Sequence, residues 1–121
     1  MTLILVWIDN WSQIYAERGK EDSKRVLRSM VDILVEVLRT TDRVTQHSDS
    51  TFAIILAETA PTGAAVLAER LGEKLQRDLG VPVRFGVAEL PEDAVAVADL
   101  LTEAEQALEY ARRSRVQVAS R

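Results

Sequence analysis

The hydrophobic positions at the start of the chain change their spacing once, and this change separates a strand from helices. Residues 2–9 (TLILVWID) form a short, nearly continuous apolar run, which is typical of a strand buried on both faces. A short helical stretch at residues 12–18 follows, and it is expected to end at Gly19. Between residues 20 and 39 apolar side chains recur every three or four positions, which predicts an amphipathic helix.

The remainder of the chain continues this alternation of strands and helices. The pattern predicts a β-hairpin of residues 43–47 and 52–56, followed by a helix at residues 61–79 and a strand at residues 81–88. A third helix is expected at residues 95–113 and a final edge strand at residues 115–119. A hairpin between two crossover helices is the split β-α-β arrangement. We therefore expect an α/β (α+β) fold: a ferredoxin-like or palm βαββαβ core with a mainly antiparallel sheet, helices packed on one face, and an extra C-terminal helix and strand.

Composition narrows the function classes. The 121 residues suit one domain, and 15 Lys and Arg against 19 Asp and Glu give a net charge of −4, which argues against a nucleic-acid partner. The absence of cysteine excludes disulfides and thiol chemistry. The longest apolar run, residues 3–8, is far shorter than the roughly 20 residues of a membrane span. We expect a cytoplasmic protein with no membrane insertion, in which the single histidine, His47, is a turn or edge residue and no metal ligand.

Two carboxylates lie at positions where this topology could support chemistry. Asp9 ends the first strand and Asp49 lies in the hairpin turn, and these two points are neighbours in the expected fold. Carboxylates there could hold Mg²⁺ against substrate phosphates, although two acids make a poor site. The structural interpretation is that Asp9 caps the strand end and Asp49 stabilises the turn.

Four segments, in the correct order and spacing, carry a resemblance to one family: residues 8–14 (IDNWSQI), 42–52 (DRVTQHSDSTF), 84–88 (RFGVA) and 104–112 (AEQALEYAR). They resemble, in turn, the DIDxFKxIND, DxVARxGGDEF, SIGVA and ADxALYxAK segments of the GGDEF family, the diguanylate cyclase domains. The resemblance implies one GGDEF-like domain over residues 1–121. It lacks the family's leading DxLTGLxNR helix, because the chain starts at the first strand.

The departures from the family pattern fall on its catalytic positions. Trp7 stands where the family has its first metal-binding Asp, and Ser50 and Thr51 replace the two acids of the signature, which here reads Ser48-Asp49-Ser50-Thr51-Phe52. Ser48 and Asp49 replace two glycines that let the backbone approach the nucleotide phosphates. The resemblance therefore implies a degenerate site: no catalytic residue, no metal, no cofactor, and no enzyme.

The nucleotide contacts are changed as well. Tyr15 and Lys24 occupy the positions of the Asn and Asp that hydrogen-bond guanine in the family. Losing those partners should remove guanine selectivity. Near the C-terminus Arg112 could replace a phosphate-binding lysine, and Arg115 lies beside Val116, which falls on the family's arginine. The alternative for this basic pair is a set of cations at a helix C-terminus.

One functional motif survives. Arg39-Thr40-Thr41-Asp42 matches the RxxD inhibitory site, which binds cyclic di-GMP in the family. An Arg can hold a guanine edge or a phosphate with two bonds while an Asp accepts from guanine N–H groups. The structural alternative is an Arg beside a helix C-terminus and an Asp that caps a turn.

Three functional hypotheses follow. The first is a catalytically inactive GGDEF-like domain that acts as a protein-interaction or scaffold module in bacterial cyclic di-GMP-type signalling. Its partner would be another protein or a second copy, since the apolar face of the helix at residues 20–39 is widened by Val31, Ile33 and Val35. The second is a cyclic di-GMP receptor that uses Arg39 and Asp42. The third is a residual nucleotide-binding enzyme that uses Asp9 and Asp49.

Overall fold

The chain alternates between strands and helices as its hydrophobic spacing predicts. A computed structural model describes residues 2–89, 102, 105–106, 109–110, 113 and 118–120. Its elements are β1 (Thr2–Ile8), α1 (Trp11–Val37), β2 (Arg43–Ser48), β3 (Thr51–Leu56), α2 (Pro61–Leu79), β4 (Val83–Glu89) and β5 (Val118–Ser120). Neither α1 nor α2 has an apolar stretch long enough to cross a bilayer.

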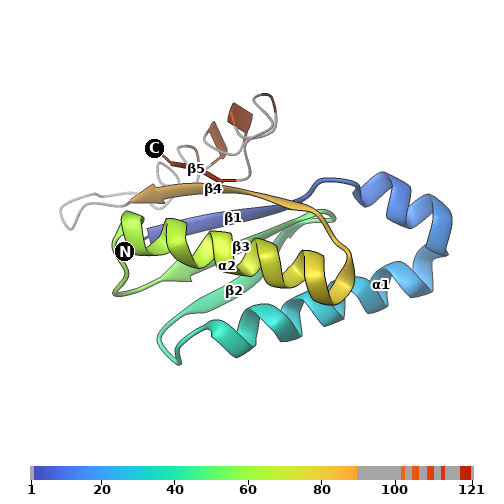
Figure 1. Cartoon of the computed structure of the whole chain (residues 1–121), viewed down its shortest axis with the longest axis horizontal. Coiled ribbons are helices and arrows are strands. Elements are labelled where there is room, and N and C mark those ends of the chain that lie inside the picture. The colour runs from blue at the N-terminus through green and yellow to red at the C-terminus, as the bar shows by residue number, and fades with distance from the viewer. Residues whose placement is uncertain are drawn as a thin grey trace.

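The strands form one sheet in the order β2-β3-β1-β4-β5, with β1 in the middle (Figure 1). β1 pairs antiparallel with β3 on one side and with β4 on the other, and β2 pairs antiparallel with β3. Among the strands that the structure describes, only the pairing of β4 with the short β5 is parallel. The prediction of a mainly antiparallel, ferredoxin-like core is confirmed.

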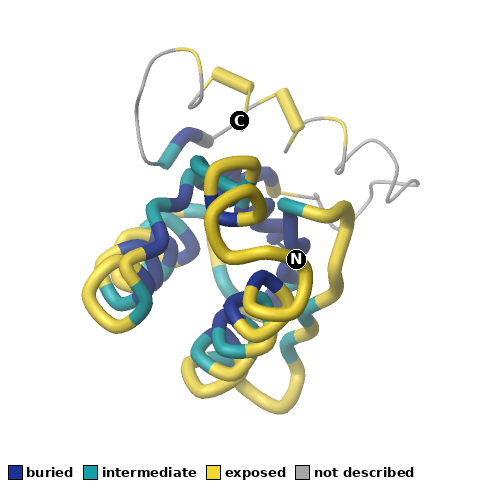
Figure 2. The backbone as a smooth tube through the Cα atoms, turned by 90° about the vertical axis from the view of Figure 1, so that its right-hand side faces the viewer, coloured by how far each residue is buried: buried dark blue, intermediate teal, exposed yellow. Residues whose placement is uncertain are grey.

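The two faces of the sheet are packed differently because successive residues of a strand point to opposite sides. Ile4, Val6 and Ile8 of β1 belong to the main core, together with the inner sides of α1 and α2. Leu3 and Leu5 point the other way and form a smaller cluster with Ala53 and Ala88. Figure 2 shows the buried positions on the strands and on the sheet-facing sides of the two helices, while the outer sides of the helices are exposed.

α1 contains a break at Gly19. Its backbone angles there, φ 78° and ψ 177°, are not helical, so a short first segment and a longer second segment meet at an angle. This combination of angles is essentially confined to glycine, because a Cβ would clash with the neighbouring backbone. The expectation that a short helix stops at Gly19 before a longer helix is therefore confirmed, although the two segments follow one another without a loop.

The ends of α2 also match the sequence prediction. Pro61 occupies the first turn, where its missing N–H costs nothing, and Gly80 ends the helix in the left-handed region with φ 65°. The predicted third helix, at residues 95–113, lies mostly outside the described residues. The described positions 102, 105–106, 109–110 and 113 are helical. Of the predicted final strand, residues 115–117 lie outside the described residues, and Val118–Ser120 form β5.

Candidate functional site

One row of residues crosses the sheet at the end of β1. Trp7 lies opposite Thr51 of β3 on one side and opposite Arg84 of β4 on the other. Residues directly opposite each other in antiparallel strands project from the same face of the sheet. Thr51 is buried, and its neighbour Ser50 accepts a hydrogen bond from the backbone N–H of Ile8 at 2.9 Å through its carbonyl oxygen. The structure therefore brings together the positions at which the sequence departs from the family's acids.

Trp7 packs against the smaller apolar cluster on the face that α1 and α2 leave open. Its indole and Ser50 also line a cavity of about 360 Å³ at the end of β1, together with Asp9 and Asn10. We call this the strand-end cavity. The side-chain oxygen of Asn10 is buried there without a hydrogen-bond partner. An apolar ring and a hydroxyl thus stand where a metal site would need hard, charged oxygen ligands.

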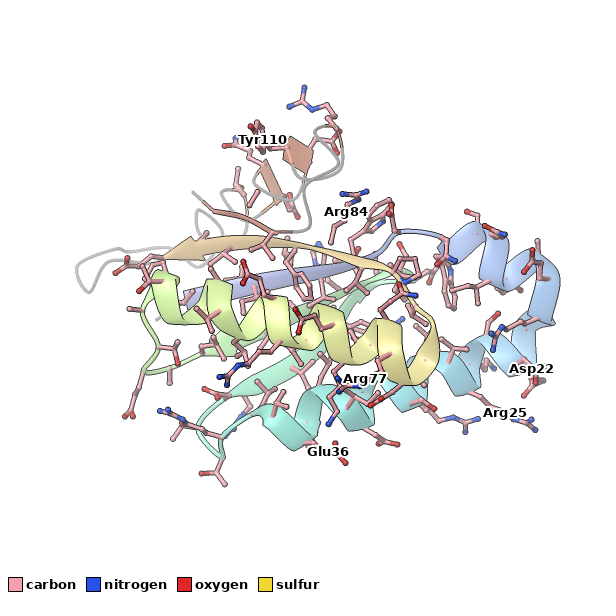
Figure 3. All side chains as sticks on the ribbon, viewed as in Figure 1. Asp22, Arg25, Glu36, Arg77, Arg84 and Tyr110 are labelled. Carbon is pink, nitrogen blue, oxygen red and sulfur yellow. The ribbon has the colours of Figure 1, made fainter. Side chains whose placement is uncertain are left out.

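The carboxylate of Asp9 is held by Arg84. Arg84 Nε donates to Asp9 Oδ2 at 3.2 Å, and the two side chains are only 17% and 33% exposed for Arg84 and Asp9 respectively. The guanidinium projects from β4 on the side away from α1 (Figure 3). Because a partly buried ion pair is weakly screened by solvent, the negative charge of Asp9 is largely compensated within the protein.

Asp49 does not join Asp9. It lines a different cavity, of about 370 Å³, and it is absent from the residues that line the strand-end cavity. Within the described ranges there is no cluster of three or more His, Asp or Glu side chains that could hold a metal ion. The two acids that the sequence suggested for a residual metal site thus face separate spaces.

The 370 Å³ cavity lies between α1 and the β2–β3 turn, and we call it the hairpin cavity. Tyr15 and Lys24, which the resemblance places at the guanine-binding positions, both line it. Trp11, from the segment at residues 8–14, lines it as well, together with Lys20 and Ser23, which the sequence did not single out. Their spacing was a usable signal, since Trp11 and Tyr15, like Lys20 and Lys24, are four residues apart and so share one side of a helix.

The turn between α1 and β2 shows what the RxxD-like pair does in the fold. Asp42 Oδ2 accepts a hydrogen bond from the backbone N–H of Arg39 at 2.9 Å, and Asp42 Oδ1 accepts one from the N–H of Ala57 at 3.4 Å. The N–H of Asp42 donates in return to the carbonyl of Arg39 at 3.0 Å. Both carboxylate oxygens therefore stabilise the turn, while the Arg39 side chain is exposed.

Two further candidates from the sequence are His47 and the basic pair near the C-terminus. His47 is on the edge strand β2, as expected, and its Nε2 lies 3.2 Å from Glu105 Oε1. Arg112 and Arg115, the predicted phosphate-binding pair, lie outside the described residues.

Comparison with known proteins identifies what this geometry is similar to. The family described as "Diguanylate cyclase, GGDEF domain" matches residues 1–117. The active GGEEF domain of a diguanylate cyclase from Vibrio cholerae is 21% identical, with a TM-score of 0.88, over 98% of this chain and 81% of that one. The GGDEF domain of DgcB from Caulobacter crescentus, solved with c-di-GMP, is 17% identical, with a TM-score of 0.88, over 98% and 76%.

A third structure contains a protein partner. Diguanylate cyclase SiaD from Pseudomonas aeruginosa, solved in complex with its activator SiaC, is 22% identical, with a TM-score of 0.89, over 99% of this chain and 49% of that one. At these identities the likeness to each structure shows a common fold. No protein of curated function matches the sequence.

Proposed function

This chain belongs to the GGDEF family of cyclic di-GMP signalling, and we propose that it is a catalytically inactive member that acts as a protein-interaction or scaffold module. The observation that carries the proposal is the row at the end of β1. Trp7 pairs with Thr51 there, Ser50 adjoins them, and the remaining acid, Asp9, is bound to Arg84.

The chemistry explains why this row argues against cyclase activity. Transfer of a nucleotidyl group needs Mg²⁺ to bridge the substrate phosphates, and Mg²⁺ is held by carboxylate oxygens in near-octahedral geometry. An indole offers no ligand, and the neutral hydroxyls of Ser50 and Thr51 are weak substitutes for carboxylates. Arg84 engages Oδ2 of Asp9 and offsets its charge, which weakens the attraction of this carboxylate for a cation.

The interaction part of the proposal is supported by apolar side chains on the outer surface of the helices. Val35 and Val37 at the end of α1 are 53% and 39% exposed, and Val66 of α2 is 52% exposed. Val31 and Ile33, which we expected to share in this surface, pack against the main core. Because these valines are about half exposed, burying each against a partner contributes on the order of 1 kcal/mol, so several such contacts favour association.

The catalytic half of the proposal is tested by incubating the purified chain with GTP and Mg²⁺ or Mn²⁺ and following cyclic di-GMP by chromatography. We expect no product, while the active Vibrio cholerae GGEEF domain, assayed beside it, gives product. Formation of cyclic di-GMP that disappears in Asp9→Asn would overturn the proposal and establish the residual enzyme.

The interaction half is tested by sedimentation velocity over a wide range of protein concentration. We expect a concentration-dependent increase in mass that Val35→Glu lowers by at least about tenfold in association constant. The matched control is Asp32→Glu, which keeps the charge of an exposed position on α1 and should leave association unchanged. A monomer at every concentration excludes self-association and leaves a protein of a different sequence as the partner to be identified by its dependence on Val35.

The receptor function remains the second candidate, because the Arg39 guanidinium is exposed beside Asp42 and the similar DgcB domain was solved with c-di-GMP. Calorimetric titration with cyclic di-GMP separates the two candidates. Heat that is lost in Arg39→Ala supports a receptor. Absence of heat supports a module that works through protein contacts alone, as does heat that Arg39→Ala leaves unchanged, since binding then lies elsewhere.

A further inference from the structure

We propose that the hairpin cavity is a binding site for a small aromatic carboxylate. Its volume of about 370 Å³ lies at the lower end of the roughly 300–1,000 Å³ of small-molecule sites, which suits a ligand of one or two fused rings. The inference rests on the side chains of this cavity and is independent of the proposed function.

The cavity has an aromatic wall. The ring centroids of Trp11 and Tyr15 are 6.3 Å apart with an interplanar angle of 57°, so the two rings are tilted against each other and are not stacked face to face. Trp11 is partly buried and packs against the core, while Tyr15 is 48% exposed. A planar apolar ligand can therefore contact an aromatic surface that the protein does not use up in its own stacking.

The opposite side of the cavity carries positive charge. Lys20 and Lys24 follow each other by one helical turn after the break at Gly19, and both line the cavity. Across the described ranges neither lysine has an acidic partner within ion-pair distance. The one acid that lines the cavity is Asp49, so the charge of the lining side chains is positive. Two ammonium groups with three donors each favour an anion.

Ser23 supplies an independent indication of a ligand. The residue is 1% exposed, and its hydroxyl oxygen is buried without a hydrogen-bond partner although it belongs to the lining of this cavity. Buried hydroxyls are nearly always paired, so an unpaired one calls for a specific reason. A carboxylate bound by the lysines and in reach of Ser23 would accept a hydrogen bond from its hydroxyl and remove the deficit.

The same side chains disfavour guanine. The N1–H and N2–H groups of guanine need acceptors, whereas the ammonium groups of Lys20 and Lys24 can donate only to its O6 and N7. Apart from the hydroxyls of Tyr15 and Ser23, the acceptors at the cavity are Asp49 and Gln46, both exposed on the hairpin. An aromatic ring with one carboxylate uses the lysines, Ser23 and the aromatic wall together.

The test is isothermal titration of the full chain with indole-3-carboxylate, compared with indole-3-carboxamide and guanosine. We expect binding of the acid, and affinity at least about tenfold weaker for the neutral amide and for guanosine. Lys24→Gln and Ser23→Ala should each weaken binding of the acid by about tenfold, since each removes one charge-assisted hydrogen bond. Lys74→Gln is the matched control, because Lys74 pairs with Glu36 outside this cavity, and it should bind like the unmodified chain.

Three results would overturn the proposal: no heat with the acid, equal affinity for acid and amide, or guanosine bound more tightly than the acid. Unchanged affinity in Lys24→Gln would also overturn it. Lys24 is exposed, so its substitution leaves the core intact, and a thermal melt of each variant confirms that the folded state is retained.

Discussion

Gly19→Ala decides whether α1 is broken in solution. At φ 78° and ψ 177° this glycine has a backbone conformation that residues with a Cβ rarely adopt. A Cβ built at this position meets no atom of the rest of the protein within 4 Å, so any cost of the substitution comes from the local backbone conformation and not from tertiary packing. The break also determines how the first helical segment faces the second, and therefore how Trp11 and Tyr15 stand opposite Ser23 and Lys24.

The expected effect has a sign that distinguishes two structures. Holding a non-glycine residue in this region costs about 1–3 kcal/mol. If α1 were a straight, continuous helix, the same substitution would stabilise the protein by about 1 kcal/mol, because alanine is the better helix former. In a domain of this size 1 kcal/mol corresponds to about 3–6 °C in melting temperature. We therefore expect Gly19→Ala to unfold about 5 °C earlier, whereas a straight helix predicts later unfolding.

The measurement is the free energy of unfolding from urea titrations followed by circular dichroism, with two other glycines as references. Gly80→Ala also places a Cβ at positive φ, in the left-handed region, and should cost about 1 kcal/mol. Gly63 lies inside α2, and its new Cβ would approach the Thr59 methyl group at 3.2 Å, so Gly63→Ala should change stability by less than about 1 kcal/mol. Stabilisation by Gly19→Ala, with Gly80→Ala destabilising as expected, would refute the broken helix.

Three further expectations concern the site and the core. Asp42→Ala should lower the unfolding free energy by about 1 kcal/mol, because the turn loses two acceptors. Arg39→Ala keeps the backbone N–H of residue 39 and should change the unfolding free energy by less than about 0.5 kcal/mol. Equal effects of the two substitutions in urea titrations would contradict this role of Asp42. A double-mutant cycle of Asp9→Asn and Arg84→Gln should give a coupling of about 1 kcal/mol that shrinks when salt is raised; additive effects would mean that the pair contributes nothing. Met30→Ala, at a fully buried position facing the sheet, should cost about 2–5 kcal/mol in thermal or urea unfolding, and a loss below 1 kcal/mol would place Met30 outside the core.

The arrangement of strands and helices was predictable because each element carries its own spacing. The continuous apolar run of β1 indicates a strand covered on both faces, and both of its faces are in fact packed, by separate clusters. Gly19 and Gly80 were expected to end helices, and both have positive φ. The hairpin needed no glycine at its turn, since β2 and β3 accommodate Asp49 and Ser50 with a change of register between Gln46 and Ser48.

The contacts that define the site join residues that are far apart in the sequence, and local sequence patterns do not predict such contacts. Asp9 meets Arg84 because β4 returns beside β1, and Asp42 reaches the backbone of Ala57 across the β2–β3 hairpin. The hairpin cavity depends on the angle between the two segments of α1. The sequence indicated that Gly19 breaks the helix, but the direction of the break is set by packing against the sheet.

The central position of β1 has a consequence for the order in which the protein folds. Thr2 faces Leu56 on one side and Glu89 on the other, so β1 gains its second neighbour only after β4 has been made. The β2–β3 hairpin and the two helices rely on nearby residues and can form early. Until β4 emerges, one edge of β1 has unpaired N–H and C=O groups along an almost wholly apolar strand, which is a template for aggregation. Pairing with β4 therefore closes the second edge of β1, and nascent chains that stop before residue 83 leave that edge open.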